Sequence, residues 1–410
     1  VTQTTIKADG TTVVRINYTR KTHTLTLTIG TGISTFTSTL TNANGLVSKS
    51  GQTYTVRYGA SVPYQATAKS GYQTVVYKNG STTVSSPLSM PDNDITITAT
   101  ASLITYSISY NLDGGSVTGN PTSYTVETAT FTLNKPTKEG YTFAGWTGTG
   151  LTEATATVTI TKGSTGNRSY TATWTVDSYK LTVTKVSGPT AEIKYTNANG
   201  IETTQTFAST STNLVLTVKY GTTITITPSG NFANIATSNY KITGVTINGA
   251  KTEMSKAGSA TATMPAKDIT AVINTDTLYG FKVTTTANGT TTAKVGETSL
   301  TIGTQYYLAS GLTVSVTATP NAGYIPAIDG DAGTVGTAKT SSFTTNTTAK
   351  VVAVTYSLSS YTVKVEVSPA GYGSVSTKEF SDVPYGSKIT VSGNKITLNG
   401  KDSTATASAN

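Results

Sequence analysis

The sequence predicts an all-β fold, organised as a tandem array of small modules that form an extended rod. Apolar and polar residues alternate over many short stretches, for example residues 106–110 and 179–183, which is typical of strands with one buried face. Thr, Val and Tyr are abundant and only 12% of the residues are charged, which favours strands over helices. A chain of 410 residues also exceeds one ordinary hydrophobic core, so several domains are expected.

The alternation of apolar and polar residues predicts an opening strand for each module. Five alternating stretches begin with an aromatic residue or with His23, and their starts lie 73 to 102 residues apart, which is the size of a small domain. Short polar joins such as residues 175–178 connect one module to the next and favour an extended arrangement. The predicted opening strands are residues 23–27, 106–110, 179–183, 281–283 and 361–365.

Three further motifs recur inside the modules. One is a strand that ends in Tyr-Gly, the second is a Met-Pro-x-x-Asp-Ile-Thr segment that leads into a closing strand, and the third is a turn with Gly-Tyr. The spacing between the first two motifs differs from module to module, as loops do on a constant scaffold. The Tyr-Gly motif occurs at residues 58–59, 220–221 and 385–386, the Met-Pro motif at 90–96 and 264–270, and the Gly-Tyr turn at 69–72, 138–141 and 321–324.

Aromatic residues provide the predicted core anchors. Tyr141 and Phe143 are two residues apart, so one face of a strand carries both, and the bend at Gly145 carries Trp146 to a new position. A strand that ends in Asp-Gly precedes this stretch at residues 110–115, and the strand 170–174 follows it. We expect the anchors of the small cores to be Tyr110, Tyr141, Phe143, Trp146, Trp174, Tyr58, Tyr220 and Tyr385.

The order of these motifs in residues 104–177 resembles the Listeria-Bacteroides repeat, also called the internalin B-repeat family. Residues 21–103 and 178–276 resemble divergent relatives of this repeat, because the Tyr-Gly and Met-Pro segments bracket them. The resemblance implies small β-grasp-like or Ig-like modules of secreted or surface-attached bacterial proteins, which act as spacers and adhesive modules without catalysis. Residues 277–358 form a further β module on weaker signals, since they lack the Met-Pro segment.

The two ends of the chain do not fit the repeat. Residues 1–20 contain a stretch that reads as the closing strand of a preceding or neighbouring-chain module, with Val13, Val14, Ile16 and Tyr18 as its apolar residues. Residues 359–410 open a module but lack a recognisable closing strand. One interpretation is a window cut from a longer array. The other is that the N-terminal strand of one molecule completes the C-terminal module of its neighbour by donor-strand complementation, head to tail.

The residues that carry most enzyme chemistry are scarce. The chain has one histidine, His23, and no cysteine, so neither a catalytic triad nor a thiolate metal site can be built, and we predict no catalytic residue and no cofactor. Asp329 and Asp331 are weak candidate Ca²⁺ ligands, and a simple turn is the alternative, because the distal bidentate Glu is absent. The sequence does not decide whether Lys and Asn side chains form an isopeptide crosslink.

Charge and hydropathy narrow the function classes. The net charge of +9 is spread over the chain without a basic cluster, so nucleic acid is not an expected partner, and no apolar stretch is long enough to span a membrane. We expect an extracellular, non-enzymatic stalk or adhesin segment of a bacterial surface protein. The alternatives are a self-assembling filament or virion fibre subunit, and a module that binds cell-wall or host glycans or proteins. An enzyme would need a carboxylate pair in a cleft.

Overall fold

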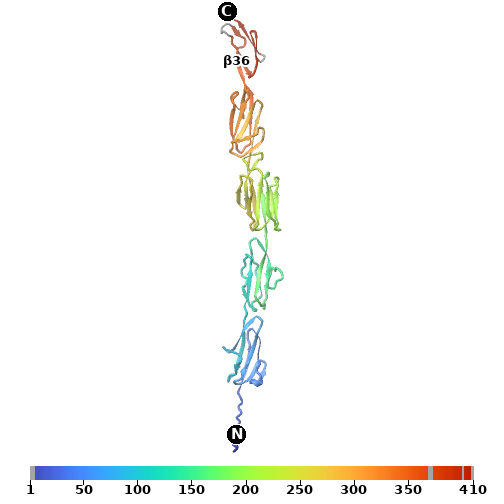
Figure 1. Ribbon diagram of the computed structural model, residues 1–410, viewed down its shortest axis with the longest axis vertical. Helices are drawn as coiled ribbons and strands as arrows, with labels where there is room; N and C mark the ends of the chain where they lie inside the picture. The colour runs from blue at the N-terminus through green and yellow to red at the C-terminus, as the bar shows by residue number, and fades with distance from the viewer. Residues whose placement is uncertain (1–4, 368–372, 399–400, 408–410) are drawn as a thin grey trace. The chain divides into compact units, whose positions relative to one another are not determined.

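The computed structural model describes residues 5–367, 373–398 and 401–407, which contain strands and one short 3-10 helix but no α-helix. The strands form successive small sheets along the chain (Figure 1). The chain divides into two compact units, Val1–Val176 and Asp177–Asn410. The prediction of an all-β fold with small sheets in tandem is therefore confirmed.

Four modules share one arrangement of four strands. In each, the opening strand pairs in parallel with the closing strand, and an antiparallel strand lies on the outer side of each of these two. Parallel neighbours cannot be joined by a tight turn, so the rest of the module lies between them in the sequence. The parallel pairs are β1 (Thr22–Ile29) with β10 (Ile95–Leu103), β11 (Tyr106–Asn111) with β16 (Arg168–Val176), β17 (Ser178–Thr184) with β26 (Ile269–Thr277), and β27 (Tyr279–Thr285) with β35 (Lys350–Leu358).

The first module has a sheet in the order β3-β4-β1-β10-β7-β8 and two smaller strand pairs, β2-β6 and β5-β9. Leu25 and Leu27 of β1 stand opposite Ile95 and Ile97 of β10, and all four side chains enter one core. The remaining elements are β2 (Ile33–Ser38), η1 (Asn42–Asn44), β3 (Leu46–Ser50), β4 (Thr53–Arg57), β5 (Ser61–Val62), β6 (Tyr64–Ala68), β7 (Tyr72–Asn79), β8 (Thr82–Val84) and β9 (Leu88–Ser89).

The second module is organised around Trp146, which is fully buried. Phe143 packs edge-on against both Trp146 and Trp174, with ring centroids 5.4 and 5.7 Å apart. Gly145 sits at a bulge with φ of 152°, where a Cβ would lie 2.8 Å from the Thr155 nitrogen, so only glycine allows the bend that turns Trp146 inward. The other strands are β12 (Ser123–Tyr124), β13 (Phe131–Thr132), β14 (Tyr141–Gly148) and β15 (Thr159–Ile160).

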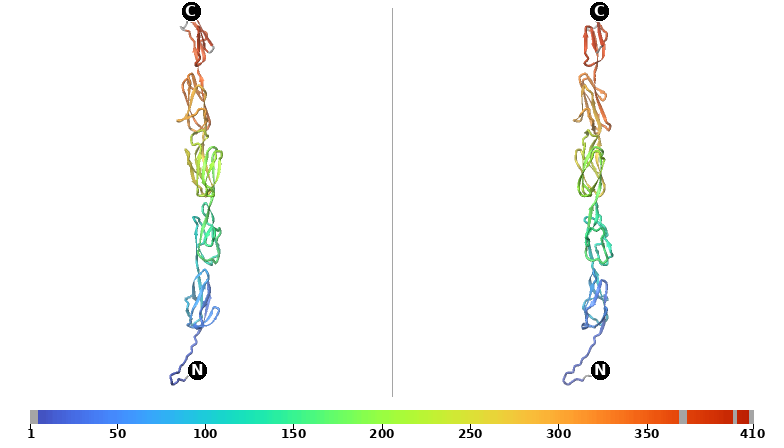
Figure 2. Two further views of the ribbon diagram at one scale, coloured as in Figure 1. Left: turned by 45° about the vertical axis from the view of Figure 1, so that its right-hand side comes forward. Right: turned by 90° about the vertical axis from the view of Figure 1, so that its right-hand side faces the viewer.

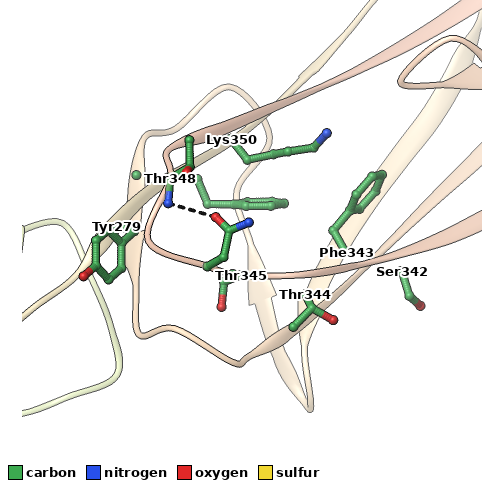
Figure 3. Close-up of a pocket in the computed structure, with 10 residues that line it drawn as sticks. Tyr279, Ser342, Phe343, Thr344, Thr345, Thr348 and Lys350 are labelled. Atoms are coloured by element: carbon green, nitrogen blue, oxygen red, sulfur yellow. Dashed lines mark hydrogen bonds between the residues drawn. The ribbon is translucent and has the colours of Figure 1, made fainter.

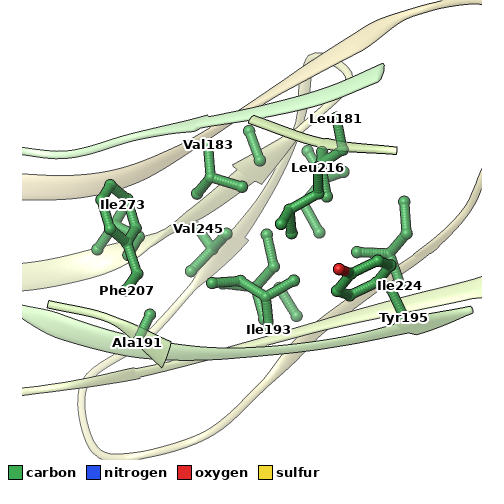
Figure 4. Packing of buried hydrophobic residues seen from close by; sticks show 14 of the residues in the cluster. Leu181, Val183, Ala191, Ile193, Tyr195, Phe207, Leu216, Ile224, Val245 and Ile273 are labelled. Carbon is green, nitrogen blue, oxygen red and sulfur yellow. The ribbon is translucent and has the colours of Figure 1, made fainter. Parts of the chain in front are cut away.

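The third module has the largest core, formed between two sheets. Its sheets have the orders β20-β17-β26-β23-β24 and β19-β18-β21-β25. Figure 4 shows Val183 and Val245 from the first sheet and Ala191 and Ile193 from the second among the packed side chains. The remaining strands are β18 (Thr190–Thr196), β19 (Glu202–Phe207), β20 (Asn213–Lys219), β21 (Thr223–Ser229), β22 (Ile235–Ala236), β23 (Tyr240–Ile247), β24 (Ala250–Glu253) and β25 (Ala260–Thr263).

The fourth module also packs two sheets together, and its larger sheet includes a strand from the third module. The orders are β22-β30-β27-β35-β32-β33 and β29-β28-β31-β34. Ile235 of β22 pairs with Leu308 and packs against the core of the fourth module. The remaining strands are β28 (Gly289–Val295), β29 (Thr298–Leu300), β30 (Tyr306–Leu308), β31 (Thr313–Pro320), β32 (Tyr324–Ile328), β33 (Asp331–Ala332) and β34 (Lys339–Thr344).

The last module departs from this arrangement. Its opening strand β36 (Ser360–Lys364), labelled in Figure 1, pairs with β38 (Glu379–Pro384), and in the part of the chain that is described no strand pairs with the other edge of β36. Its core contains only Val365, Phe380, Val383 and Leu398 as buried residues. The second sheet has the order β37-β41-β40-β39, from β37 (Gly373–Val375), β39 (Ile389–Ser392), β40 (Lys395–Leu398) and β41 (Lys401–Ala407).

The Tyr-Gly and Met-Pro motifs meet through the backbone. Gly59 donates its N–H to the Met90 carbonyl, and Met90 donates to the Ala60 carbonyl, both at 2.9 Å. In the third module, Gly221 and Met264 make the corresponding pair of bonds at the same distance. The two motifs thus hold the turn before the closing strand against the turn after the Tyr-Gly strand.

The aspartate of the Met-Pro motif fastens the start of the parallel pair. Its Oδ1 accepts the backbone N–H of the opening strand, from Thr24 to Asp94 at 2.6 Å and from Lys180 to Asp268 at 2.7 Å. A carboxylate acceptor makes such a bond stronger than a neutral one. The motif therefore sets the register in which the closing strand joins the sheet.

We predict that Asp268→Ala weakens the pairing of β17 with β26. Loss of the bond to the Lys180 N–H should cost about 1 kcal/mol, which corresponds to roughly fivefold faster amide exchange in both strands. Hydrogen exchange resolved by mass spectrometry measures this, with Lys267→Ala as the neighbouring control. Equal exchange in the two variants would contradict this role of Asp268.

Candidate functional site

The single histidine belongs to a surface ion cluster. His23 Nε2 lies 2.8 Å from Asp92 Oδ1, and Lys21 Nζ lies 3.0 Å from Asp92 Oδ2. Hydrogen bonds from Lys21 and then from His23 lower the pKa of the Asp92 carboxyl. These contacts join Lys21 and His23, at the start of the first module, to Asp92 of the Met-Pro segment. The three side chains therefore stabilise the fold of this module.

The two candidate Ca²⁺ ligands pair with different lysines. Asp329 forms an ion pair with Lys350, and Asp331 lies 2.7 Å from Lys339 Nζ. Asp329 lies in the two-residue turn between β32 and β33, and Asp331 is the first residue of β33. Asp329 and Gly330 have positive φ values, as such hairpin turns require. Within the residues described, no group of three or more His, Cys, Asp or Glu side chains is placed to hold a metal ion. Asp329 and Asp331 are thus placed as in an ordinary hairpin turn.

A surface pocket of about 320 Å³ lies in the fourth module, beside β27 and β34 (Figure 3). Its ten lining residues offer hydroxyl, amide and backbone groups together with the Lys350 ammonium, but no histidine or carboxylate. Lys350 Nζ lies 5.2 Å from the centre of the Phe343 ring and is already paired with Asp329. The pocket therefore lacks the histidine and carboxylate groups that most often serve general acid and base catalysis.

The predicted core anchors are only partly in cores. Trp146 is buried, while Tyr110, Phe143 and Trp174 are half-buried and pack against the same cluster. Tyr141 is half-buried, and Lys138 Nζ lies 4.3 Å from the centre of its ring.

The assignment of the Tyr-Gly tyrosines to cores needs correction. Tyr58 and Tyr385 are both 50% exposed, and Tyr220 is half-buried, with its ring centre 6.5 Å from that of Tyr179. The strands that carry these motifs end one residue earlier, at Arg57, Lys219 and Pro384, so the inward and outward alternation no longer applies to the tyrosine.

Tyr385 lies at the junction of the fourth and fifth modules. Its ring covers Gly323 of the Gly-Tyr turn so closely that a Cβ on Gly323 would lie 2.0 Å from the Tyr385 Cδ1. Ser359 donates its N–H to the Gly323 carbonyl at 2.8 Å, and Tyr385 donates to the Ser359 carbonyl at 2.9 Å. The Tyr-Gly motif of one module thus packs on the Gly-Tyr turn of the module before it.

The first and second modules meet at the equivalent turn. A Cβ on Gly71 would lie 2.1 Å from Val126 Cγ1. Tyr72 donates its hydroxyl to Glu127 at 3.0 Å, and Lys162 Nζ lies 3.0 Å from the other oxygen of the same carboxylate. Gly71 and Gly323 were not predicted as junction residues, although the Gly-Tyr turn that contains them repeats in the sequence.

The candidate inter-subunit strand lies outside every sheet of its own chain. Residues 11–21 form no strand, and Figure 2 shows the N-terminal segment, in dark blue, running clear of the first module's strands. Val13, Val14, Ile16 and Tyr18 are 71 to 87% exposed. Exposed apolar side chains that lie close together are typical of surfaces that contact other proteins.

Family models match two of the modules. Residues 106–172 match the Listeria-Bacteroides repeat domain, and residues 36–104 match the divergent InlB B-repeat domain. These two modules are members of the repeat family, as their motifs indicated. A search of curated proteins finds no match.

Three solved structures are similar to the chain at low identity. The Bacillus anthracis TIE protein is 12% identical with a TM-score of 0.27, and the match covers 74% of this chain and 62% of that one. A point mutant of the major pilin from Streptococcus pyogenes is 16% identical with a TM-score of 0.18, covering 63% and 99%. The pilus adhesin SpaC from Lactobacillus rhamnosus GG, in its open conformation, is 11% identical with a TM-score of 0.21, covering 80% and 55%.

The chain thus spans 62% of the TIE protein and 55% of SpaC. Among the residues that the structure describes, no helix is long and apolar enough to cross a membrane.

We predict that removing either partner of Glu127 at the first junction raises the pKa of its carboxyl, and that the two variants raise it by different amounts. Bonds from Lys162 and then from Tyr72 lower the pKa of the Glu127 carboxyl below 4.5. A lowered pKa means that the junction contact is present at neutral pH and is lost as the pH falls below 4.5 through the lowered value. NMR titration of the Glu127 carboxyl should show a higher pKa in Tyr72→Phe and a larger rise in Lys162→Met.

The control for this titration is Lys135→Met, which removes a lysine of the same module outside the junction contact. An unchanged Glu127 titration in both Tyr72→Phe and Lys162→Met would show that the contact does not form in solution.

Proposed function

We propose that the chain is a stalk or adhesin segment of an extracellular bacterial surface protein, in which the modules carry mechanical load and perform no catalysis. Membership of two modules in a repeat family of surface proteins supports the location. The separate cores of the successive modules support the role, because each core is built from its own module's strands with few contributions from neighbours.

The parallel pairing of the first and last strands carries this proposal. The chain enters a module at the start of the opening strand and leaves at the end of the closing strand, which runs in the same direction. Entry and exit therefore lie at opposite ends of the strand pair. A pull on the chain loads all the hydrogen bonds between these strands together, in shear, instead of opening them one at a time.

A glycan-stacking role receives less support. Phe143 and Trp146 pack in the core of the second module. Tyr58 and Tyr385 are exposed but belong to different modules. A sugar platform needs adjacent exposed rings, and these residues do not supply one.

The mechanical role predicts the response of the chain to force. In single-molecule stretching, the four complete modules should unfold in separate events, each releasing roughly 25–35 nm of chain for 75 to 100 residues. Thr182→Pro, which removes a backbone donor from β17, should abolish or weaken one event and leave the others unchanged.

Thr206→Pro is the matched control, because β19 lies at the edge of the second sheet of the same module and outside the loaded pair. A single cooperative rupture of the whole chain, or unfolding at negligible force, would contradict the proposal.

Head-to-tail self-association is the second candidate function, favoured by the exposed apolar segment at residues 13–18. Such an interface is heterologous, so each added copy presents the same free ends and the assembly propagates into a filament. Sedimentation velocity over a wide concentration range should show growing oligomers for the full chain and a monomer for the chain without residues 1–20. Identical profiles for the two proteins would count against it.

A further inference from the structure

We propose that residues 12–18 of one copy of this chain form the closing strand of the last module of another copy, in parallel with β36. The inference rests on the second candidate function and specifies its interface. Two observations lead to it. The exposed segment 12–18 has the pattern of a closing strand. The opening strand β36 has one edge that no strand of the described residues pairs with.

The segment shares its apolar pattern with the closing strand of the fourth module and is identical to it at three of seven positions. Residues 12–18 read Thr-Val-Val-Arg-Ile-Asn-Tyr, and residues 350–356 of β35 read Lys-Val-Val-Ala-Val-Thr-Tyr. In β35, Val352, Val354 and Tyr356 are buried while Val351 is exposed. By this alignment Val14, Ile16 and Tyr18 form the core-facing side of the segment. Val13, Arg15 and Asn17 form the outer side, so no charge needs to be buried.

The position of the segment supports the same assignment. At two of the three junctions where both strands belong to a parallel pair, the first paired residue of the closing strand stands thirteen residues before its counterpart in the next opening strand, as Ile95 stands before Ile108 and Arg168 before Leu181. At the third junction the spacing is twelve residues, from Ile269 to Phe281. Counting thirteen residues back from Leu25 of β1 gives Thr12, the residue aligned with Lys350. The agreement is independent of the apolar pattern.

In the last module, which would accept the segment, β36 occupies the position of an opening strand. It pairs with its Tyr-Gly strand as β1 does, with Tyr361 opposite Val383 where His23 stands opposite Val56. In the other four modules the second edge of this strand receives the closing strand.

The module around β36 has a small apolar core and a surface pocket beside this strand. In the described part of the module four apolar residues are buried. The pocket, of about 530 Å³, is lined by Val365, Val367 and Val375 together with charged residues such as Lys364 and Glu379. An added strand would bring apolar side chains to this region and satisfy the backbone groups of the open edge.

The register follows from the fourth module. There, Lys282 stands opposite Val351 and Val283 opposite Val352. Transferred to the interface between copies, this places Lys364 opposite Val13 and Val365 opposite Val14. The contact joins the N-terminal segment of one copy to the last module of the next, which makes the partner a second copy of this chain.

Cysteine crosslinking tests the register directly, because the natural chain has no cysteine. One protein carries Val13→Cys and a second carries Lys364→Cys; the parallel register places their Cα atoms about 5 Å apart, within disulfide reach. We expect a mixed disulfide between the two proteins under mild oxidation. Asn17→Cys with Lys364→Cys is the control, since that pair becomes opposed only if the strand enters antiparallel.

Threonine substitutions test which side of the segment faces the core. Val14→Thr replaces a methyl group by a hydroxyl on the core-facing side, and Ile16→Thr also shortens the side chain, whereas Val13→Thr replaces a methyl group by a hydroxyl on the outer side. We expect the first two to weaken self-association by about tenfold or more, and Val13→Thr by less than about twofold.

The outcomes separate this inference from the function on which it rests. Oligomers that persist in all three variants, without the Val13–Lys364 crosslink, would leave self-association standing and overturn the strand assignment. A chain that stays monomeric at every concentration would overturn the second candidate function and this inference together. Crosslinking of only the Asn17 pair would replace the parallel register with an antiparallel one and overturn the proposal.

Discussion

The parallel contact between the first and last strands of a module is the constraint on which the rest of this structure depends. Two adjacent parallel strands need a long connection, so every other strand of the module has to lie between them in the sequence. The intervening strands supply the outer neighbours in the first sheet and the strands of the second sheet. The same contact places the entry and exit of the chain at opposite ends, which makes a tandem array of such modules suited to transmit a pull.

The recurring motifs serve this contact more than they serve the cores. The methionine of the Met-Pro segment exchanges backbone bonds with the turn after Tyr-Gly, and the aspartate of that segment accepts a bond from the opening strand. These bonds hold the start of the closing strand next to the opening strand. The tyrosine of the Tyr-Gly motif lies outside the core of its module. In the last module this tyrosine packs on the preceding module.

Alternation and motif spacing predicted the strands because both are local properties of the sequence. They identified β1, β11, β17, β27 and β36 and the all-β class correctly. They failed at Tyr58 and Tyr385, because alternation does not show where a strand ends. They also failed at Gly71 and Gly323, because the residue that covers each glycine comes from the next module. A site that forms between modules depends on contacts that no single stretch of sequence contains.

The separation in sequence between the paired strands has a consequence for biosynthesis. Ile108 pairs with Arg168, and Leu181 pairs with Ile269, so the central contact of a module joins residues that are 60 to 88 positions apart. Contacts of this range make folding slow relative to that of helical proteins of the same size. A module also has no complete sheet until its final residues have been translated. Each module therefore stays unfolded for most of its synthesis, and an unfolded chain is the form that could pass a narrow export channel to the extracellular location proposed above.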